Sequence, residues 1–224
     1  MNTKSLLKLG LLCTLTLAMT GCGGLWGWIA TTLMPPPTVP AEYVVPESKS
    51  VCVLINDQSM RSNAYSVPYK MMLRINKILQ EKEVFANVVT NRELQSLKMT
   101  RSDFGRLTPY QIGKLLKVDY VMKVDVLDFG LQPAPNESIF RGRLGATVTL
   151  YNVNDSDVAW PRDEFGGRKM PTIEDAYTDS YDSKYATKLS TKMANQMADK
   201  IAKLFYDYEK DSHVALPDTE FDGY

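Results

Sequence analysis

The chain has 224 residues, 44% of them hydrophobic and 23% charged, and these shares are typical of a globular protein. Its 26 basic and 26 acidic residues balance, and removal of the two lysines within residues 1–21 leaves a net charge of −2. Nucleic-acid binding requires a concentrated basic surface, which this sequence lacks, so no nucleic acid is expected among its partners.

The first 21 residues have the parts of a secretory signal peptide. Two lysines precede an apolar segment over residues 9–19, which is far shorter than the ~18–20 residues that span a bilayer. The Met19-Thr20-Gly21-Cys22 stretch that follows resembles the lipobox of bacterial lipoproteins, with Met in place of the usual Leu. The resemblance implies that residues 1–21 are removed. Cys22 then becomes a mature N-terminus carrying a diacylglycerol and an N-acyl chain such as palmitate.

A doubly lipidated Cys22 would hold the protein in a membrane, because each buried CH₂ contributes about 0.8 kcal/mol and two chains bind stably where one does not. The alternative is an ordinary cleaved signal peptide in which Cys22 is incidental. Gly23 and Gly24 follow the cysteine, whereas an acidic residue there commonly marks retention in the inner membrane of such lipoproteins. The resemblance therefore favours the outer membrane, with the protein facing the periplasm.

The mature chain divides by composition into three parts. Residues 22–47 contain five prolines and are predicted to be an extended tether that follows the lipidated cysteine. Residues 48–210 are predicted to form a single α/β domain, and residues 211–224 an acidic tail. Cys52 is the only cysteine left in the domain, which excludes an intramolecular disulfide and predicts a buried, inert thiol.

The first half of the domain alternates strands and helices. The β-branched run Val51–Ile55 predicts a buried strand, and residues 85–90 predict a second one. A helix begins at Pro68 between them, and a short helix begins near Asn91. The apolar face of the first helix is predicted to carry Met72, Ile75 and Leu79, flanked by Met71 and Ile78, and the second helix is predicted to bury Leu94 and Leu97.

The Thr108-Pro109-Tyr110-Gln111 stretch is a capping box with proline at the first helical position, which predicts a helix to about Lys117. Its inward residues are predicted to be Ile112, Leu115 and Leu116. Residues 118–131, 140–153 and 158–165 are then predicted as three strands of an antiparallel meander. A final helix is predicted over residues 183–209, with an apolar face formed by Ala186, Leu189, Met193, Met197, Ile201, Leu204 and Phe205.

These elements give an α+β fold (an α/β sandwich) in the order β-α-β-α-α-β-β-β-α, with a mixed sheet and a long C-terminal helix. The helix-to-strand junction Gln111–Val121 resembles that of bacterial envelope proteins with a TolB N-terminal-like fold, a group that includes the lipoproteins CsgG and LpoB. Val118 departs from the alanine usual in that pattern. The resemblance covers residues 50–205 in element order and implies a fold and an envelope setting, but no particular partner.

The sequence offers little catalytic chemistry. Its single histidine, His213, lies in the tail, and no nucleophile elbow or phosphate-binding loop occurs. Asp125 and Asp128 are the candidate paired acids, although cross-strand ion pairs with Arg141 or Arg143 are favoured. The calcium-like run Asn152, Asn154 and Ser156 lacks the required Gly and Glu and predicts an Asx turn instead. No metal and no cofactor are expected.

Two surfaces are candidates for binding. The loop from Trp160 to Arg168 combines residue types common in binding hot spots, with Trp160, Arg162, Phe165 and Arg168 as its candidates. Tyr177, Tyr181 and Tyr185 recur every four residues and would form a stripe if that segment were helical. The alternatives are that Trp160 is buried at a strand end and that the tyrosines pack against the sheet.

The sequence thus predicts a membrane-anchored lipoprotein that acts as a non-catalytic accessory, assembly or docking module of the cell envelope. Its expected partners are the membrane, through the N-terminal lipid, and an envelope protein or a second copy of the chain. Two alternatives stay open. One is an anchored enzyme that uses carboxylates on envelope glycans, and the other is a module that binds a small ligand.

Overall fold

A computed structural model describes residues 37–58, 66–133, 140–177 and 183–210. The signal peptide, Cys22, most of the tether, Tyr181 and the acidic tail with His213 lie outside these residues. The chain divides into two units, of which the larger spans Pro40–Tyr208. In the smaller unit, the backbone N–H of Lys210 donates to the carbonyl of Pro37 at 2.8 Å. Strands β1 (Thr38–Val39) and β9 (Tyr208–Glu209) form a separate two-stranded sheet.

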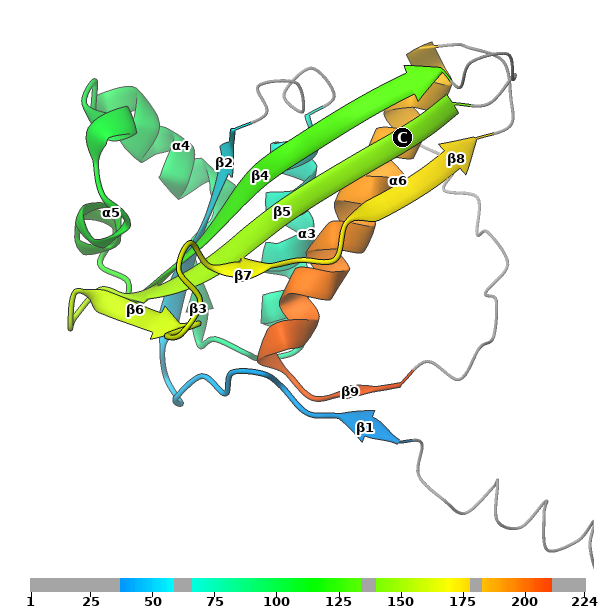
Figure 1. The fold of residues 1–224 in the computed structure, drawn as a ribbon. Coiled ribbons are helices and arrows are strands. Elements are labelled where there is room, and N and C mark those ends of the chain that lie inside the picture. Colours follow the sequence, from blue (N-terminus) through cyan, green and yellow to red (C-terminus); the bar gives the residue numbers. More distant parts are fainter. Residues whose placement is uncertain (1–36, 59–65, 134–139, 178–182, 211–224) are drawn as a thin grey trace, which may run out of the picture. The chain divides into compact units, whose positions relative to one another are not determined.

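The larger unit is built on a seven-stranded mixed sheet, in which β5 is the most extensively paired strand (Figure 1). Strand β2 pairs in parallel with β3 and β4, whereas β5 pairs antiparallel with β4, β6, β7 and β8. The strands are β2 (Ser50–Asp57), β3 (Asn87–Val88), β4 (Tyr120–Pro133), β5 (Phe140–Asn152), β6 (Asp157–Trp160), β7 (Arg168–Lys169) and β8 (Ile173–Tyr177). The predicted α+β class, mixed sheet and antiparallel β4–β5–β6 arrangement are confirmed.

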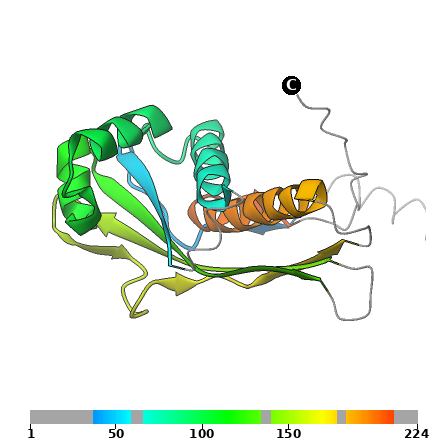
Figure 2. The same cartoon turned by 90° about the horizontal axis from the view of Figure 1, so that it is seen from above.

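Helices α3 (Val67–Glu81) and α6 (Ser183–Ala202) lie side by side on one face of the sheet (Figure 2). Arg74 of α3 joins Asp199 of α6 at 2.7 Å, which ties the two helices together. Helices α4 (Asn91–Thr100) and α5 (Pro109–Leu116) occupy one end of the sheet. Gly113 of α5 lies against Val121, which the strand alternation places on the face opposite α3 and α6.

A β-bulge at Leu127 sets which residues of β4 face the helices. The register between β4 and β5 shifts between Val126 and Asp128, so Leu127 has no partner across the ladder. Val124 and Val126 before the bulge and Phe129 after it are all buried, although strict alternation would send Phe129 to the other face. The bulge therefore keeps one apolar face along a fourteen-residue strand.

Several predicted boundaries differ from the structure. The strand predicted over residues 158–165 ends at Trp160, because Pro161 has no N–H to continue the ladder. The strand predicted over 85–90 is reduced to Asn87–Val88, and strands β7 and β8 were not predicted. The helix predicted over 183–209 ends at Ala202, followed by a 3₁₀ turn over Lys203–Phe205. A second 3₁₀ turn, Phe104–Arg106, precedes α5.

Most predicted core residues are buried, including Met71, Met72, Ile75 and Leu79 on α3 and the α6 stripe from Ala186 to Ile201. Leu115 is an exception, since 42% of its surface is exposed on α5. That helix is only eight residues long and buries just Ile112 and Gly113, so its apolar face is narrower than its sequence suggests. Cys52 is buried and free, as predicted.

Gly113 allows α5 to approach the sheet closely. A Cβ at this position would overlap Cγ2 of Val153 and lie 3.0 Å from Cγ2 of Val121. We therefore expect Gly113→Ala to lower the free energy of unfolding by about 1–3 kcal/mol, despite alanine's better helix propensity. Urea denaturation measures the change. The double variant Gly113→Ala/Val153→Ala should recover part of the loss beyond additivity, and simple additivity would contradict a steric cause.

Candidate functional site

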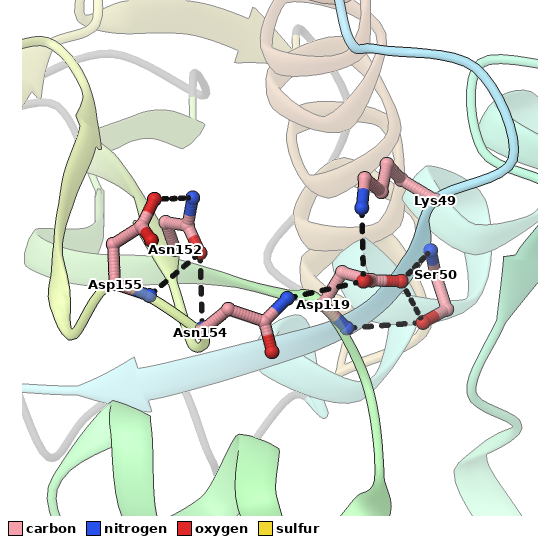
Figure 3. A network of polar contacts seen from close by, with 6 residues as sticks. All are labelled: Lys49, Ser50, Asp119, Asn152, Asn154 and Asp155. Atoms are coloured by element: carbon pink, nitrogen blue, oxygen red, sulfur yellow. Dashed lines mark hydrogen bonds and ion pairs between the residues drawn. The ribbon is translucent and has the colours of Figure 1, made fainter.

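Asp119 is the centre of a polar network at the end of the sheet where β2 and β4 begin (Figure 3). One carboxylate oxygen accepts from the backbone N–H of Ser50 at 2.9 Å and from the Ser50 hydroxyl at 2.8 Å. The other oxygen accepts from Lys49 Nζ and from Asn154 Nδ2, both at 3.3 Å. The backbone N–H of Asp119 donates to Ser50 Oγ at 3.0 Å, so Ser50 and Asp119 bind reciprocally.

The donors around Asp119 stabilise its charged form. Burial alone would raise the pKa of this carboxyl, but the Ser50 backbone N–H, the Ser50 hydroxyl and Lys49 outweigh it and lower the pKa to about 2. Both oxygens are occupied by donors from within the chain. The network thus binds three chain segments to each other, and Asp119 acts as a structural clamp. Asp119 falls within the Gln111–Val121 junction, but no motif in the sequence predicts its role.

The predicted Asx turn is confirmed in the connection between β5 and β6. Asn152 Oδ1 accepts from the backbone N–H groups of Asn154 at 3.0 Å and Asp155 at 3.2 Å, while its Nδ2 donates to Asp155 Oδ2 at 2.7 Å. Ser156 has a φ of 55°, in the left-handed region. These contacts make the asparagine-rich run a tight turn that presents Asn154 to Asp119 (Figure 3).

The candidate acids Asp125 and Asp128 both take part in ion pairs on the sheet. Asp125 is buried and binds Lys123 Nζ and Asn56 Nδ2, each at 2.9 Å. Asp128 pairs with Arg143 on the neighbouring strand at 3.0 Å, as predicted. The register places Asp125 and Asp128 opposite Thr147 and Gly145, so the bulge brings both acids to one face. Each carboxylate thus has a cationic partner there, which explains the two acids as structural groups.

The loop from Trp160 to Arg168 has a fixed base and an exposed tip. Trp160 is half-buried and packs edge-on against Phe205 with ring centroids 5.5 Å apart. At the other end, Arg168 binds Glu164 at 2.9 Å within the loop and Glu42 at 3.2 Å. Arg162 is exposed, and Phe165 is as exposed as in an extended chain, at 110%. Trp160 thus lies at the end of β6 and is half-buried against Phe205, whereas Phe165 stands at the exposed tip.

Gly166 and Gly167 form the turn behind the tip. Their φ angles of 88° and 89° lie in the region that side chains avoid, and a Cβ at Gly167 would overlap Thr149 Oγ1. The backbone N–H of Gly167 donates to the carbonyl of Glu164 at 3.2 Å. Two glycines are therefore required for the loop to fold back onto β5 and leave Phe165 outside.

Residues 40–45, predicted as part of the tether, belong to the larger unit and lie next to this loop. The backbone N–H groups of Glu42 and Tyr43 donate to the carbonyl of Leu204 at 2.9 and 3.1 Å. The Tyr43 ring contacts Phe205 at a centroid distance of 6.4 Å. Burial and a hydrogen bond with Tyr120 raise the pKa of Tyr43 to about 12. We call residues 40–45 the strap, because they hold the chain against the end of α6.

The three candidate tyrosines do not form one helical stripe. Tyr177 ends strand β8, Tyr181 lies outside the described residues, and Tyr185 is half-buried in the first turn of α6. The change from strand to helix between Tyr177 and Tyr185 breaks the four-residue period. A role for any of these tyrosines at an interface stays a prediction.

No group of three or more His, Cys, Asp or Glu side chains suited to a metal ion occurs among the described residues. Within the same residues, no helix is both long and apolar enough to cross a bilayer. A shallow depression of about 340 Å³ lies between β8 and α6 and is lined by Thr172, Ile173, Glu174, Gln196, Asp199 and Lys200. Its Asp199 is already bound by Arg74.

No protein-family model matches the chain, and no curated protein matches it. Solved structures with some likeness include three bacterial proteins. Lipoprotein GNA1162 from Neisseria meningitidis has a TM-score of 0.43 and 15% identity, over 69% of this chain and 99% of that one. The PelC dodecamer from Paraburkholderia phytofirmans has a TM-score of 0.38 and 9% identity, over 77% of this chain and 97% of that one. The LpoB C-terminal domain from Salmonella enterica has a TM-score of 0.31 and 13% identity, over 60% of this chain and 86% of that one. Because these scores and identities are low, the function proposed for this chain rests on its own residues.

The Asp119 clamp predicts a specific pH dependence of stability. The pKa of Asp119 in the folded protein lies below the ordinary value of 3.8. The ionised carboxylate therefore stabilises the fold fully at pH values above 3.8, and this stabilisation is lost as the pH falls through about 2. We expect Asp119→Asn to lower the free energy of unfolding by about 2 kcal/mol at pH 7 and by progressively less towards pH 2. Urea denaturation at several pH values measures this difference.

Asp103→Asn is the matched control, because Asp103 forms an exposed ion pair with Arg101 at 2.9 Å and binds no distant segment among the described residues. This variant should leave the free energy of unfolding nearly unchanged. If the two variants lose the same stability, or if the Asp119→Asn loss is independent of pH, the clamp interpretation is wrong.

Proposed function

We propose that the protein is a lipid-anchored, non-catalytic docking module of the bacterial cell envelope. Cys22 anchors it in the outer membrane facing the periplasm, and the Trp160–Arg168 loop binds an envelope protein. The lipobox-like Met19–Cys22 stretch supports the anchor. The exposed Phe165 on a loop with a fixed base is the observation that carries the docking role.

An exposed phenylalanine contributes nothing to folding, and single exposed apolar residues are common on protein surfaces. Phe165 differs because its loop is already ordered by the buried Pro161, the glycine turn and the Arg168 ion pairs. A partner that covers Phe165 gains apolar burial without a large cost for ordering the loop. Arg162 and Phe165 are both exposed, and arginine and phenylalanine are both enriched in protein interfaces.

The strap limits how far this loop can lie from the lipid. Because residues 40–45 belong to the larger unit, residues 22–39 connect Cys22 with it. A fully extended chain of that length reaches at most ~65 Å. Pro40 therefore lies within about 65 Å of the membrane, and the proposed partner must present its binding surface to the loop from near that membrane. An integral or lipid-anchored envelope protein meets that condition.

The anchor is tested by Cys22→Ala in the full chain. Without the cysteine no lipid can be attached, so the variant should move from the membrane to the soluble fraction after detergent-free washing. Cys52→Ala is the control, since Cys52 is buried in β2 and should leave the fractionation unchanged. Membrane retention of the Cys22→Ala variant would contradict lipid anchoring.

Docking is tested by a photoreactive phenylalanine analogue placed at position 165 of the lipidated chain in intact bacteria. We expect a discrete crosslinked product that contains an envelope protein or a second copy of the chain. Met99 on α4 provides the matched position, because it is apolar, 81% exposed and on another element. The same products at both positions, or none at position 165, would count against the docking role.

Phe165→Ala separates binding from folding. Because the side chain is fully exposed, its removal should change the free energy of unfolding by less than about 0.5 kcal/mol. Affinity for the crosslinked partner should fall at least tenfold, the range expected of an interface hot spot. A variant that binds as tightly as the wild type would show that Phe165 lies outside the interface.

A further inference from the structure

Strands β6 and β8 form an outer edge of the sheet. Both pair with β5, and no further strand pairs with either of them in the part of the chain that the structure describes. An edge strand exposes backbone N–H and C=O groups, which makes it a template for a strand from another molecule. How this edge is protected therefore bears on whether copies of the chain pair through their sheets.

An aspartate covers a backbone N–H on each of these strands. Asp157 Oδ1 accepts from the backbone N–H of Val158 in β6 at 2.8 Å. Asp175 Oδ1 accepts in the same way from the N–H of Ala176 in β8 at 2.9 Å. In both cases the carboxylate belongs to the residue immediately before the donor. The same local device thus occurs on two strands that are separate in sequence.

Asp175 is also fixed from the side of α6. Its Oδ2 lies 3.1 Å from Lys192 Nζ, and its side chain is only 19% exposed. The exposed Ala176 adds no bulk that would keep a second strand away. Obstruction at this point of β8 therefore depends on the carboxylate of Asp175.

We propose that Asp157 and Asp175 close the β6–β8 edge to strand addition by a second copy of this chain. An incoming strand needs the N–H groups of Val158 and Ala176 as donors, and both are already bound to a carboxylate. The incoming carbonyl oxygen would also approach a negative charge. To pair, the second copy must displace these carboxylates, and the side chain of Asp175, only 19% exposed, cannot fully replace its lost hydrogen bond with water.

The charge pattern of β8 also opposes pairing with a second copy. Antiparallel self-pairing of β8 would bring the acidic Glu174–Asp175 pairs of two copies together, and like charges across a ladder are destabilising. Every copy carries the same edge, so any assembly of identical chains presents it at high local concentration. The closed edge leaves the Trp160–Arg168 loop, which lies between β6 and β7, for specific contacts.

The test compares the lipidated full chain with the variant Asp157→Ala/Asp175→Ala, both purified in the same detergent. Light scattering after gel filtration measures mass against concentration. We expect the variant to self-associate at a concentration at least tenfold lower than the wild type. In the associated variant, the amides of Val158 and Ala176 should be protected from hydrogen exchange, and dilution should remove that protection.

Two controls separate the proposed mechanism from loss of local structure. Asp157→Asn/Asp175→Asn keeps an oxygen that accepts the N–H bonds, and Lys192→Ala removes the ion pair but keeps Asp175. Lys192→Ala should associate like the wild type, and the asparagine pair, which keeps the acceptors but loses the charges, should associate less readily than the alanine pair. The proposal is overturned if the alanine pair does not associate, if Lys192→Ala associates equally, or if association leaves the two amides unprotected. If the alanine pair does not fold, Asp157→Ala alone applies the same criteria to β6.

Discussion

The carboxylate of Asp119 fixes the relation between two parallel strands that no hairpin can align. β2 and β4 pair over seven residues, beginning at Val51 and Tyr120, and a long crossover with helices α3, α4 and α5 separates them in sequence. Ser50 and Asp119 directly precede that first pair and bind each other through three hydrogen bonds. A one-residue slip would break these bonds and turn the apolar residues of β2 to the other face of the sheet. Asp119 therefore specifies register as well as stability.

Correct register at this end has consequences along the whole of β4. Met122, Val124 and Val126 then face α3 and α6, and β5 follows the same register through the antiparallel ladder. The bulge at Leu127 resets the alternation, so the distal part of β4 continues the apolar face with Phe129. A bulge also turns Asp128 to the face that already carries Asp125. Two acids that alternation alone would separate become neighbours, each held by its own cation.

Local sequence signals predicted the parts of this fold that local physics determines. The Thr108 capping box, the proline at the start of α3 and the apolar run of β2 act within a few residues, and all three predictions are confirmed. The features that were missed depend on distant partners. Strands β7 and β8 are too short for periodicity, and they exist because β5 pairs with them. The bulge at Leu127 leaves no composition signal, and the strap is ordered by the carbonyl of Leu204, far along the chain.

The candidate site shows the same division. Residue type identified the Trp160–Arg168 loop, but only the structure separates Trp160, which packs on Phe205, from the exposed Phe165. It also shows that Phe205 has a second aromatic neighbour, Tyr43 of the strap. One buried ring thus supports both the base of the loop and the segment through which the chain enters the larger unit, and the Arg168–Glu42 ion pair links the two at the surface. Because the strap and the loop share this support, a shift of the strap at the end of the tether would also shift the base of the loop that carries Phe165.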